Sequence, residues 1–168
     1  IDELDPADHL VTTSTSNFLD FAAPTPRWDA LWRLPAIDLV QVHMYGIGDS
    51  LPLNLVPAAA TTTTRAATYG KPVHLSEVGI DLRGPAETRA ADPTGKGVHE
   101  GAWIGFFSGG AGAGMPWWWD GVIEPDDLYG TMLDGLDALL DGVDVPAERF
   151  DGGGATAGGG INAARLCR

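Results

Sequence analysis

The sequence has little that would cross-link the chain or anchor it in a membrane. It has one cysteine, Cys167, which can form no disulfide bond within the chain and so leaves the redox compartment open. No run of about 18 apolar residues is present, so we expect no membrane-spanning helix. The first residues also lack the basic and apolar pattern of a signal peptide. Because the chain starts at Ile1 without a methionine, we expect a fragment or a processed product.

Basic residues are scarce as well. Ten lysines and arginines stand against 23 aspartates and glutamates, which gives a net charge of −13. This charge would repel phosphate groups, so it argues against nucleic acid or an anionic membrane as a partner and favours a neutral or cationic ligand. The 168 residues are 44% apolar and 20% charged, a composition typical of one globular domain.

What the sequence does contain is an alternation of strand and helix patterns. Branched and aromatic residues predict strands at 10–14, 37–45, 73–77 and 112–119. The spacing of apolar residues predicts helices at 27–34, 57–69 and 98–108, and a last helix with its leucines on one face at 128–143. A loop rich in glycine, proline and aspartate is expected at 79–97. No hairpin signal interrupts this order, so we expect four strand–helix units.

The alternation predicts an α/β fold with a parallel sheet and right-handed crossovers. A doubly wound sheet normally has a glycine-rich turn after its first strand, and the run Ser14-Thr15-Ser16-Asn17 offers none. Half of a (β/α)8 TIM barrel is the other architecture, because a full barrel needs about 250 residues and four units would occupy roughly half of that. Residues 146–168 are rich in glycine and are expected to be a linker or the start of a following module.

Polar residues gather where two of the expected strands end. Glu77 closes the apolar strand 73–77, and Gly79 allows the chain to turn out of it. In parallel α/β folds this end of the sheet carries the ligand-binding and catalytic side chains. His43 and Tyr45 lie two residues apart at the end of the preceding strand, so both point to one side and can donate hydrogen bonds to a neighbouring carboxylate. A tyrosine so placed would keep Glu77 ionised.

Three consecutive tryptophans close the fourth expected strand. Trp117 and Trp119 share one face and would form a flat apolar platform for the C–H face of a sugar ring. Asp120 follows directly and is a candidate for binding the sugar hydroxyls. Trp118 points to the opposite side, so we expect a structural role for it.

These residues resemble a known enzyme family. His43-x-Tyr45 at one strand end, Glu77-x-Gly79 at the next and Trp117 at the last resemble the C-terminal half of clan A glycoside hydrolases, particularly the family-five, cellulase-like group. The resemblance covers about residues 9–143. The run at 115–120, Met-Pro-Trp-Trp-Trp-Asp, is also similar to cellulase-like bacterial hydrolases of poorly defined specificity.

The resemblance implies both a fold and roles for single residues. Residues 1–145 would be the last four strand–helix units of a (β/α)8 TIM barrel, with Glu77 as the nucleophile after strand seven. His43 and Tyr45, after strand six, would contact the nucleophile and the substrate, and Trp117 would stack on the sugar in the −1 subsite. The enzyme would be secreted, would need no cofactor or metal, and would cleave β-linked poly- or oligosaccharides with retention of configuration.

The chain departs from this family in one respect that affects activity. Retaining hydrolysis uses two carboxyl groups about 5 to 5.5 Å apart, one as nucleophile and one as acid/base. In the family the acid/base follows strand four in an Asn-Glu pair, which here would precede Ile1. We therefore predict that this polypeptide alone is inactive and that activity requires the missing N-terminal half of the barrel, whose absence would leave two sheet edges exposed.

Other interpretations of the same residues remain open. Glu77 could be an ordinary solvated residue at a turn, and His43 and His74 could be core histidines. A chain that keeps the aromatic platform but lacks the acid/base could be a non-catalytic carbohydrate-binding barrel. A metal-dependent barrel hydrolase is less favoured, because the histidines show no His-x-His or His-Glu-x-x-His spacing. The sequence of the residues that precede Ile1 would discriminate between enzyme and binding protein.

Overall fold

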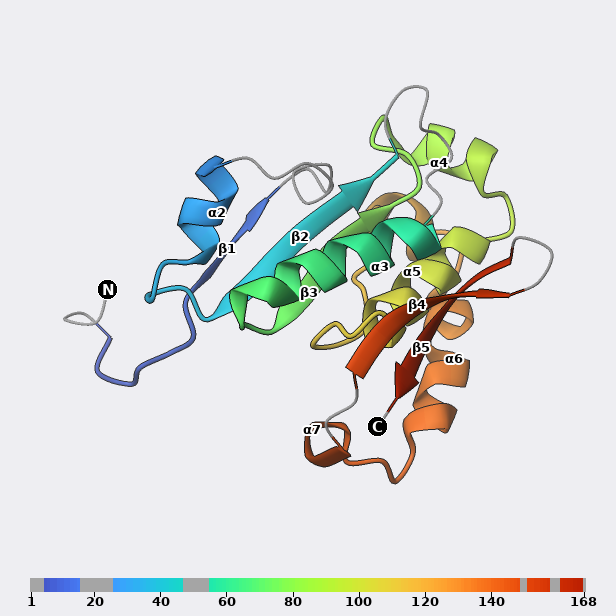
Figure 1. The fold of residues 1–168 in the computed structure, drawn as a ribbon. Coiled ribbons are helices and arrows are strands. Elements are labelled where there is room, and N and C mark those ends of the chain that lie inside the picture. Colours follow the sequence, from blue (N-terminus) through green and yellow to red (C-terminus); the bar gives the residue numbers. More distant parts are fainter. Residues whose placement is uncertain (1–4, 16–25, 47–54, 149–150, 158–160, 168) are drawn as a thin grey trace.

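The chain has a mixed α/β fold, seen in a computed structural model that describes residues 5–15, 26–46, 55–148, 151–157 and 161–167 (Figure 1). Its centre is a parallel sheet of three strands, β1 (Thr12–Thr15), β2 (Leu39–Tyr45) and β3 (Val73–Gly79), which lie in sequence order. Helix α2 (Pro26–Trp32) connects β1 to β2. Helix α3 (Leu55–Ala66), extended by the 3-10 turn η2 (Ala67–Tyr69), connects β2 to β3. The predicted α/β class and parallel pairing are confirmed for these units.

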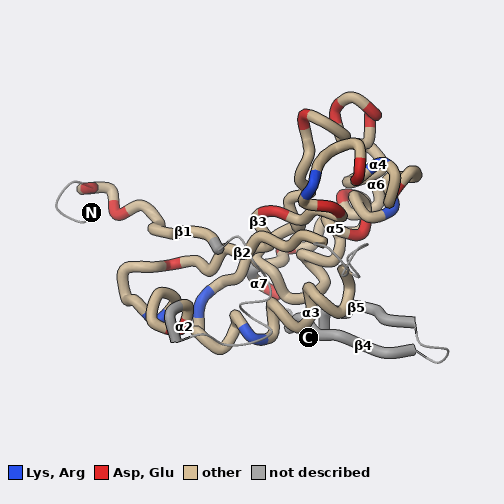
Figure 2. The backbone as a smooth tube through the Cα atoms, turned by 90° about the horizontal axis from the view of Figure 1, so that it is seen from above, with Lys and Arg blue, Asp and Glu red and all other residues tan. Residues whose placement is uncertain are grey.

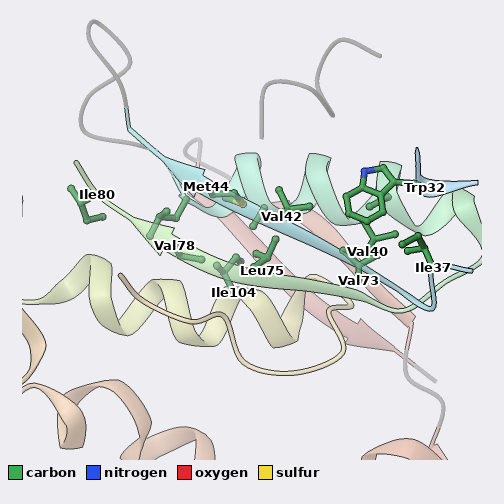
Figure 3. Close-up of a cluster of buried hydrophobic side chains, with 13 residues drawn as sticks. Trp32, Ile37, Val40, Val42, Met44, Val73, Leu75, Val78, Ile80 and Ile104 are labelled. Carbon is green, nitrogen blue, oxygen red and sulfur yellow. The ribbon is translucent and has the colours of Figure 1, made fainter. Parts of the chain in front are cut away.

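The two faces of the sheet differ in character. Alternate residues of β2 and β3 point to the helices and form the core with side chains from the flanking elements (Figure 3). This core contains Val40, Val42, Met44, Val73, Leu75 and Val78 from the strands and Trp32, Leu55, Ala59 and Ile104 from the helices. The opposite face carries polar, half-buried residues, among them Gln41, His43, His74 and Glu77. The candidate catalytic residues therefore lie on the face that the helices leave uncovered.

The segment after β3 differs from the expected long loop. It contains helix α4 (Pro85–Ala91), followed by helix α5 (Lys96–Phe107). The loop prediction for 79–97 was wrong over α4, because that helix has the sequence Pro-Ala-Glu-Thr-Arg-Ala-Ala and no apolar stripe for periodicity to detect. Its start follows a different signal, since Pro85 occupies the first turn, where a missing N–H costs nothing.

The fourth expected strand forms only in part. Residues 111–117 run beside β3 and exchange backbone hydrogen bonds with it, from Met115 N to Leu75 O (2.9 Å) and from Val78 N to Met115 O (2.8 Å). Only the pair Val78 and Pro116 makes a regular parallel bridge, so the prediction of a full strand at 112–119 was wrong. Close packing explains the difference. Gly105 of α5 lies so close to this segment that a Cβ atom on it would be 2.1 Å from the Gly114 nitrogen. The N–H of Gly114 donates a hydrogen bond to the Ala102 carbonyl of α5 (3.0 Å) and not to a strand of the sheet.

The last predicted helix is shorter and more exposed than its leucine pattern suggests. A π-helical turn, η3 (Trp119–Ile123), precedes helix α6 (Tyr129–Leu140). Leu136 is the buried residue of α6, whereas Leu133 is 41% exposed and Leu139 is 52% exposed. The leucines predicted to share one face of this helix therefore differ in exposure, and the face as a whole is not buried. None of the described helices is long and apolar enough to cross a membrane.

The C-terminal part folds back over the helices. Helix α7 (Val145–Glu148) is followed by an antiparallel pair of strands, β4 (Asp151–Ala157) and β5 (Ile161–Cys167), which lies beside α3 and α5 (Figure 1). The backbone of the glycine-rich tail thus forms a hairpin, and whether residues 146–168 are a linker or the start of a module stays a prediction. Acidic positions gather around α4 and the loops near it, whereas lysines and arginines are few and scattered (Figure 2).

Candidate active site

A β-bulge in β3 brings Glu77 to the polar face of the sheet. Strict alternation would place Glu77 on the same face as Val73 and Leu75, which is the core face. The pairing of β2 with β3 runs from Val42 opposite Leu75 directly to His43 opposite Glu77, so Ser76 is an extra residue. Such a bulge re-aims the residues that follow it. It sets Glu77 level with His43, on the face that carries the candidate site.

Two predicted residues, Tyr45 and His43, contact the same carboxylate oxygen of the third, Glu77. The Tyr45 hydroxyl donates a hydrogen bond to Oε2 of Glu77, and Nδ1 of His43 lies 3.1 Å from the same oxygen. The side chains of His43 and Glu77 are 18% and 23% exposed, so a ligand can reach them. Both contacts are made to Oε2, and within the described ranges no side chain donates a hydrogen bond to Oε1 of Glu77. The described residues therefore hold the carboxylate through one of its two oxygens.

The environment of Tyr45 keeps its phenol protonated. Its side chain is buried, with 4% of the residue exposed. Burial raises the pKa of Tyr45 far above its ordinary value, and the hydrogen bond to Glu77 and the negative charge of that carboxylate raise it further. The phenol is thus a permanent hydrogen-bond donor near neutral pH.

We expect alkaline pH to destabilise the chain partly through Tyr45. Because folding raises the pKa of the phenol, its stabilising contribution is complete below pH about 10 and is lost as the pH rises above that value. In the variant Tyr45→Phe, the free energy of unfolding should therefore fall less steeply between about pH 10 and 11, by up to about 1.4 kcal/mol per pH unit. Urea unfolding of both proteins at several pH values measures this slope. Equal slopes for the two proteins would contradict the assignment.

Trp117 and Trp119 line a groove next to this cluster. Its volume is about 380 Å³, and it is lined by Ser76, Met115, Pro116, Trp117, Trp119, Ile123, Tyr129 and Met132. Ser76 connects the groove to the Glu77 cluster, because the bulge places these two neighbours side by side in β3. Trp119 is 51% exposed. Trp117 and Trp119 therefore share the groove, as the sequence predicts for a platform.

Two other residues of the tryptophan segment lie outside the groove lining. Trp118 adopts a left-handed backbone conformation, with a φ of 59°, and its indole Nε1 donates to the Asp81 carbonyl (2.9 Å). This contact ties η3 to the end of β3, as expected for a structural residue. Asp120 is exposed in η3, and no hydrogen bond within the described ranges joins it to Glu77. Its role in binding substrate stays a prediction.

No protein-family model, curated protein or solved structure matches this chain. The case for the site therefore rests on its own residues and their geometry.

Two of the three remaining histidines, His74 and His99, and the buried aspartate Asp81 have structural partners. Nε2 of His74 lies 3.1 Å from the Ala113 carbonyl, and Nδ1 of His99 lies 2.8 Å from the Thr131 carbonyl. The buried Asp81 pairs with Arg83 at 2.5 Å, and this hydrogen-bonded guanidinium lowers the pKa of the Asp81 carboxyl. Within the described residues no three His, Cys, Asp or Glu side chains are grouped as metal ligands.

Sequence reasoning missed several residues at this site. The sequence assigns Ser76 no role, because alternation turns it away from its neighbour Glu77 and the bulge brings the two to one face. Tyr129 and Met132 line the groove from the first turns of α6, far along the chain from the strand ends. Nothing in the sequence around a tyrosine or a methionine at the start of a helix indicates that its side chain lines a distant groove.

Proposed function

We propose that this chain is the nucleophile-bearing half of a retaining glycoside hydrolase that cleaves β-linked poly- or oligosaccharides. The observation that carries the proposal is the convergence of Tyr45 and His43 on one oxygen of Glu77 at the ends of neighbouring parallel strands. A carboxylate held in this way, half-buried and next to an aromatic groove, suits nucleophilic attack on a sugar. The resemblance of these residues to cellulase-like hydrolases supports the same role.

In the proposed reaction, Oε1 of Glu77 attacks the anomeric carbon. A bond forms between this oxygen and the sugar while the bond from the anomeric carbon to the leaving oxygen breaks, and an acid group outside this chain protonates that oxygen. Water, deprotonated by the same group, then displaces Glu77 and releases the sugar. Tyr45 and His43 fix Oε2, so the carboxylate keeps its orientation through both steps.

The groove supplies the contacts that would hold the sugar. Trp117 and Trp119 offer aromatic surface for the C–H faces of a pyranose, and Ser76 contributes the one hydroxyl in the lining apart from Tyr129. The Oγ atom of Ser76 is buried and has no hydrogen-bond partner among the residues that the structure describes.

The sheet supports the proposal of a partial (β/α)8 barrel. Parallel sheets are almost always covered on both faces, yet here the helices cover one face and the other carries the polar cluster. Strand order β1-β2-β3, with residues 111–117 alongside β3, is the order of consecutive barrel strands. The N-terminal half of the barrel would close the sheet, cover the polar face and bring the acid/base.

A second function, non-catalytic carbohydrate binding, is favoured by one observation. In the described part of the chain no second carboxylate shares a hydrogen-bond partner with Glu77. If the complete protein also lacks an acid/base, the aromatic groove would bind sugars without cleaving them. The two functions differ in a single measurable property, which is turnover.

The stereochemistry of the products tests the proposed function. We expect a longer polypeptide that contains this chain and the preceding residues to release the β-anomer first from an aryl β-glycoside, because two displacements restore the configuration. Proton NMR detects the anomer before it equilibrates in solution. Initial release of the α-anomer would contradict the nucleophile role of Glu77. Sugar binding by a folded protein without any release would favour the binding function instead.

A further inference from the structure

We infer that Gly79 is a positioning residue of this site, because its missing side chain leaves the space in which the ring of Tyr45 lies. The inference deepens the proposed function and depends on it only for the effect on catalysis. The structural part, that Gly79 seats Tyr45 on Glu77, can be tested without any assay of activity.

The two residues face each other across the sheet. Tyr45 and Gly79 are paired in the register of β2 and β3, and both are buried. A Cβ atom on Gly79 would lie 2.4 Å from Cδ1 and 2.5 Å from Cε1 of the Tyr45 ring. Separations this short are not observed for real Cβ atoms. The ring therefore occupies the volume that any side chain at position 79 would need.

Conformation does not explain a glycine at this position. The backbone of Gly79 does not have a positive φ, so an alanine could adopt it without strain. The third neighbour of the added Cβ would be Trp117 Cβ at 3.7 Å, which is an ordinary contact. The requirement for glycine at position 79 thus comes from one neighbour, the ring of Tyr45.

A methyl group at position 79 would disturb the contact between Tyr45 and Glu77 in either of two ways. The Tyr45 ring is rigid, and moving it away from the methyl group by rotation about the Cα–Cβ bond carries the hydroxyl away from Oε2. Alternatively, β3 moves away from β2 and takes Glu77, two residues before Gly79, with it. Both routes separate the phenol from the carboxylate.

The variant Gly79→Ala tests the inference in this chain, with Gly112→Ala as its matched control. A Cβ on Gly112 would meet no heavy atom within 4 Å, so that variant adds a methyl group without a clash. The readout is the hydroxyl proton of Tyr45 in the NMR spectrum, assigned by its disappearance in Tyr45→Phe. We expect this resonance to be lost or strongly shifted in Gly79→Ala and unchanged in Gly112→Ala.

A double-mutant cycle separates positioning from a general effect on packing. Tyr45→Ala removes the ring, so adding Gly79→Ala to it should lower the urea midpoint far less than Gly79→Ala does in the parent sequence. If Gly79→Ala alone does not fold, the double variant should recover folding. Equal losses in the two backgrounds, a double variant that still fails to fold, or an intact Tyr45 resonance in Gly79→Ala would each overturn the inference.

Catalysis adds an independent readout in the longer polypeptide. There Gly79→Ala should lower kcat by roughly 100-fold, the cost of a misplacement of about 1 Å in a positioned group. The two claims fail in different ways. A lost Tyr45 resonance together with a polypeptide that cleaves no glycoside would leave the positioning role standing and contradict the proposed hydrolase.

Discussion

Replacing Glu77 by glutamine should abolish glycoside hydrolysis by the longer polypeptide, with kcat lower by on the order of 10⁶-fold, as for loss of a nucleophile in other covalent enzymes. The amide has no negative charge with which to attack the anomeric carbon. Its oxygen can still accept the hydrogen bond from Tyr45, so the side chain keeps its place and the fold is preserved. Initial rates on aryl β-glycosides with a chromogenic leaving group measure the effect.

The matched control is Glu100→Gln. Glu100 lies on α5, where it pairs with Lys96 at 3.1 Å, and its side chain is 35% exposed. This variant removes one glutamate charge outside the candidate site, so kcat should stay unchanged. A second variant, Glu77→Ala, should regain turnover with azide, which can enter the vacated space and attack from the same side to give an α-glycosyl azide. If Glu77→Gln retains activity within about tenfold of the parent, Glu77 is not the nucleophile.

The strands that position the site could be predicted from the sequence because local pattern and tertiary environment agree there. Strand β2 is dense in branched and aromatic residues, and its predicted span, 37–45, differs from the observed one by two residues at one end. Strand β3 was expected at 73–77 and extends to Gly79. His43, Tyr45 and Glu77 sit where these strands end, so their expected convergence at one edge of the sheet is confirmed, whereas their roles in a reaction stay predictions.

The sequence predicts the contacts of His43 and Tyr45 with Glu77, but it does not predict the β-bulge that makes these contacts possible. Alternation alone assigns Glu77 to the core side of β3, and nothing in the run Ser76-Glu77 announces a bulge. The prediction of a full strand at 112–119 failed for a related reason. Its glycines permit backbone contact with α5, and this tertiary packing takes precedence over strand propensity. Such effects arise from neighbours that are remote in sequence.

The exposed leucines of α6 show a different limit. Periodicity indicates that Leu133 and Leu139 belong to an apolar face, but it does not say which element covers that face. In the described ranges, Gly135 of α6 packs against the ring of Trp103 on α5, which orients the helix and leaves the two leucines exposed. In the proposed whole barrel, the neighbouring helix of the N-terminal half would cover them.

The isolated chain should cleave aryl β-glycosides no faster than the uncatalysed reaction, although it carries the proposed nucleophile Glu77. Hydrolysis with retention needs a group that protonates the leaving oxygen and later deprotonates water. Nδ1 of His43 does not supply this group, because it faces the Glu77 oxygen that accepts the hydrogen bond from Tyr45. Joining the N-terminal half to the chain should raise the rate by at least about 10⁶-fold, the low end of enzymatic accelerations.

The comparison needs three proteins assayed on the same substrate, namely the isolated chain, its Glu77→Gln variant and the longer polypeptide. Near-UV circular dichroism of the isolated chain, which is sensitive to its tryptophans, establishes that the assayed sample is folded. If the chain and its Glu77→Gln variant both match the buffer rate, the second carboxyl group comes from outside this chain. Turnover by the isolated chain that disappears in Glu77→Gln would instead place the acid/base within these 168 residues and contradict the half-barrel account of the activity. The acid/base would then have to be an acidic residue that the described hydrogen bonds do not connect to Glu77.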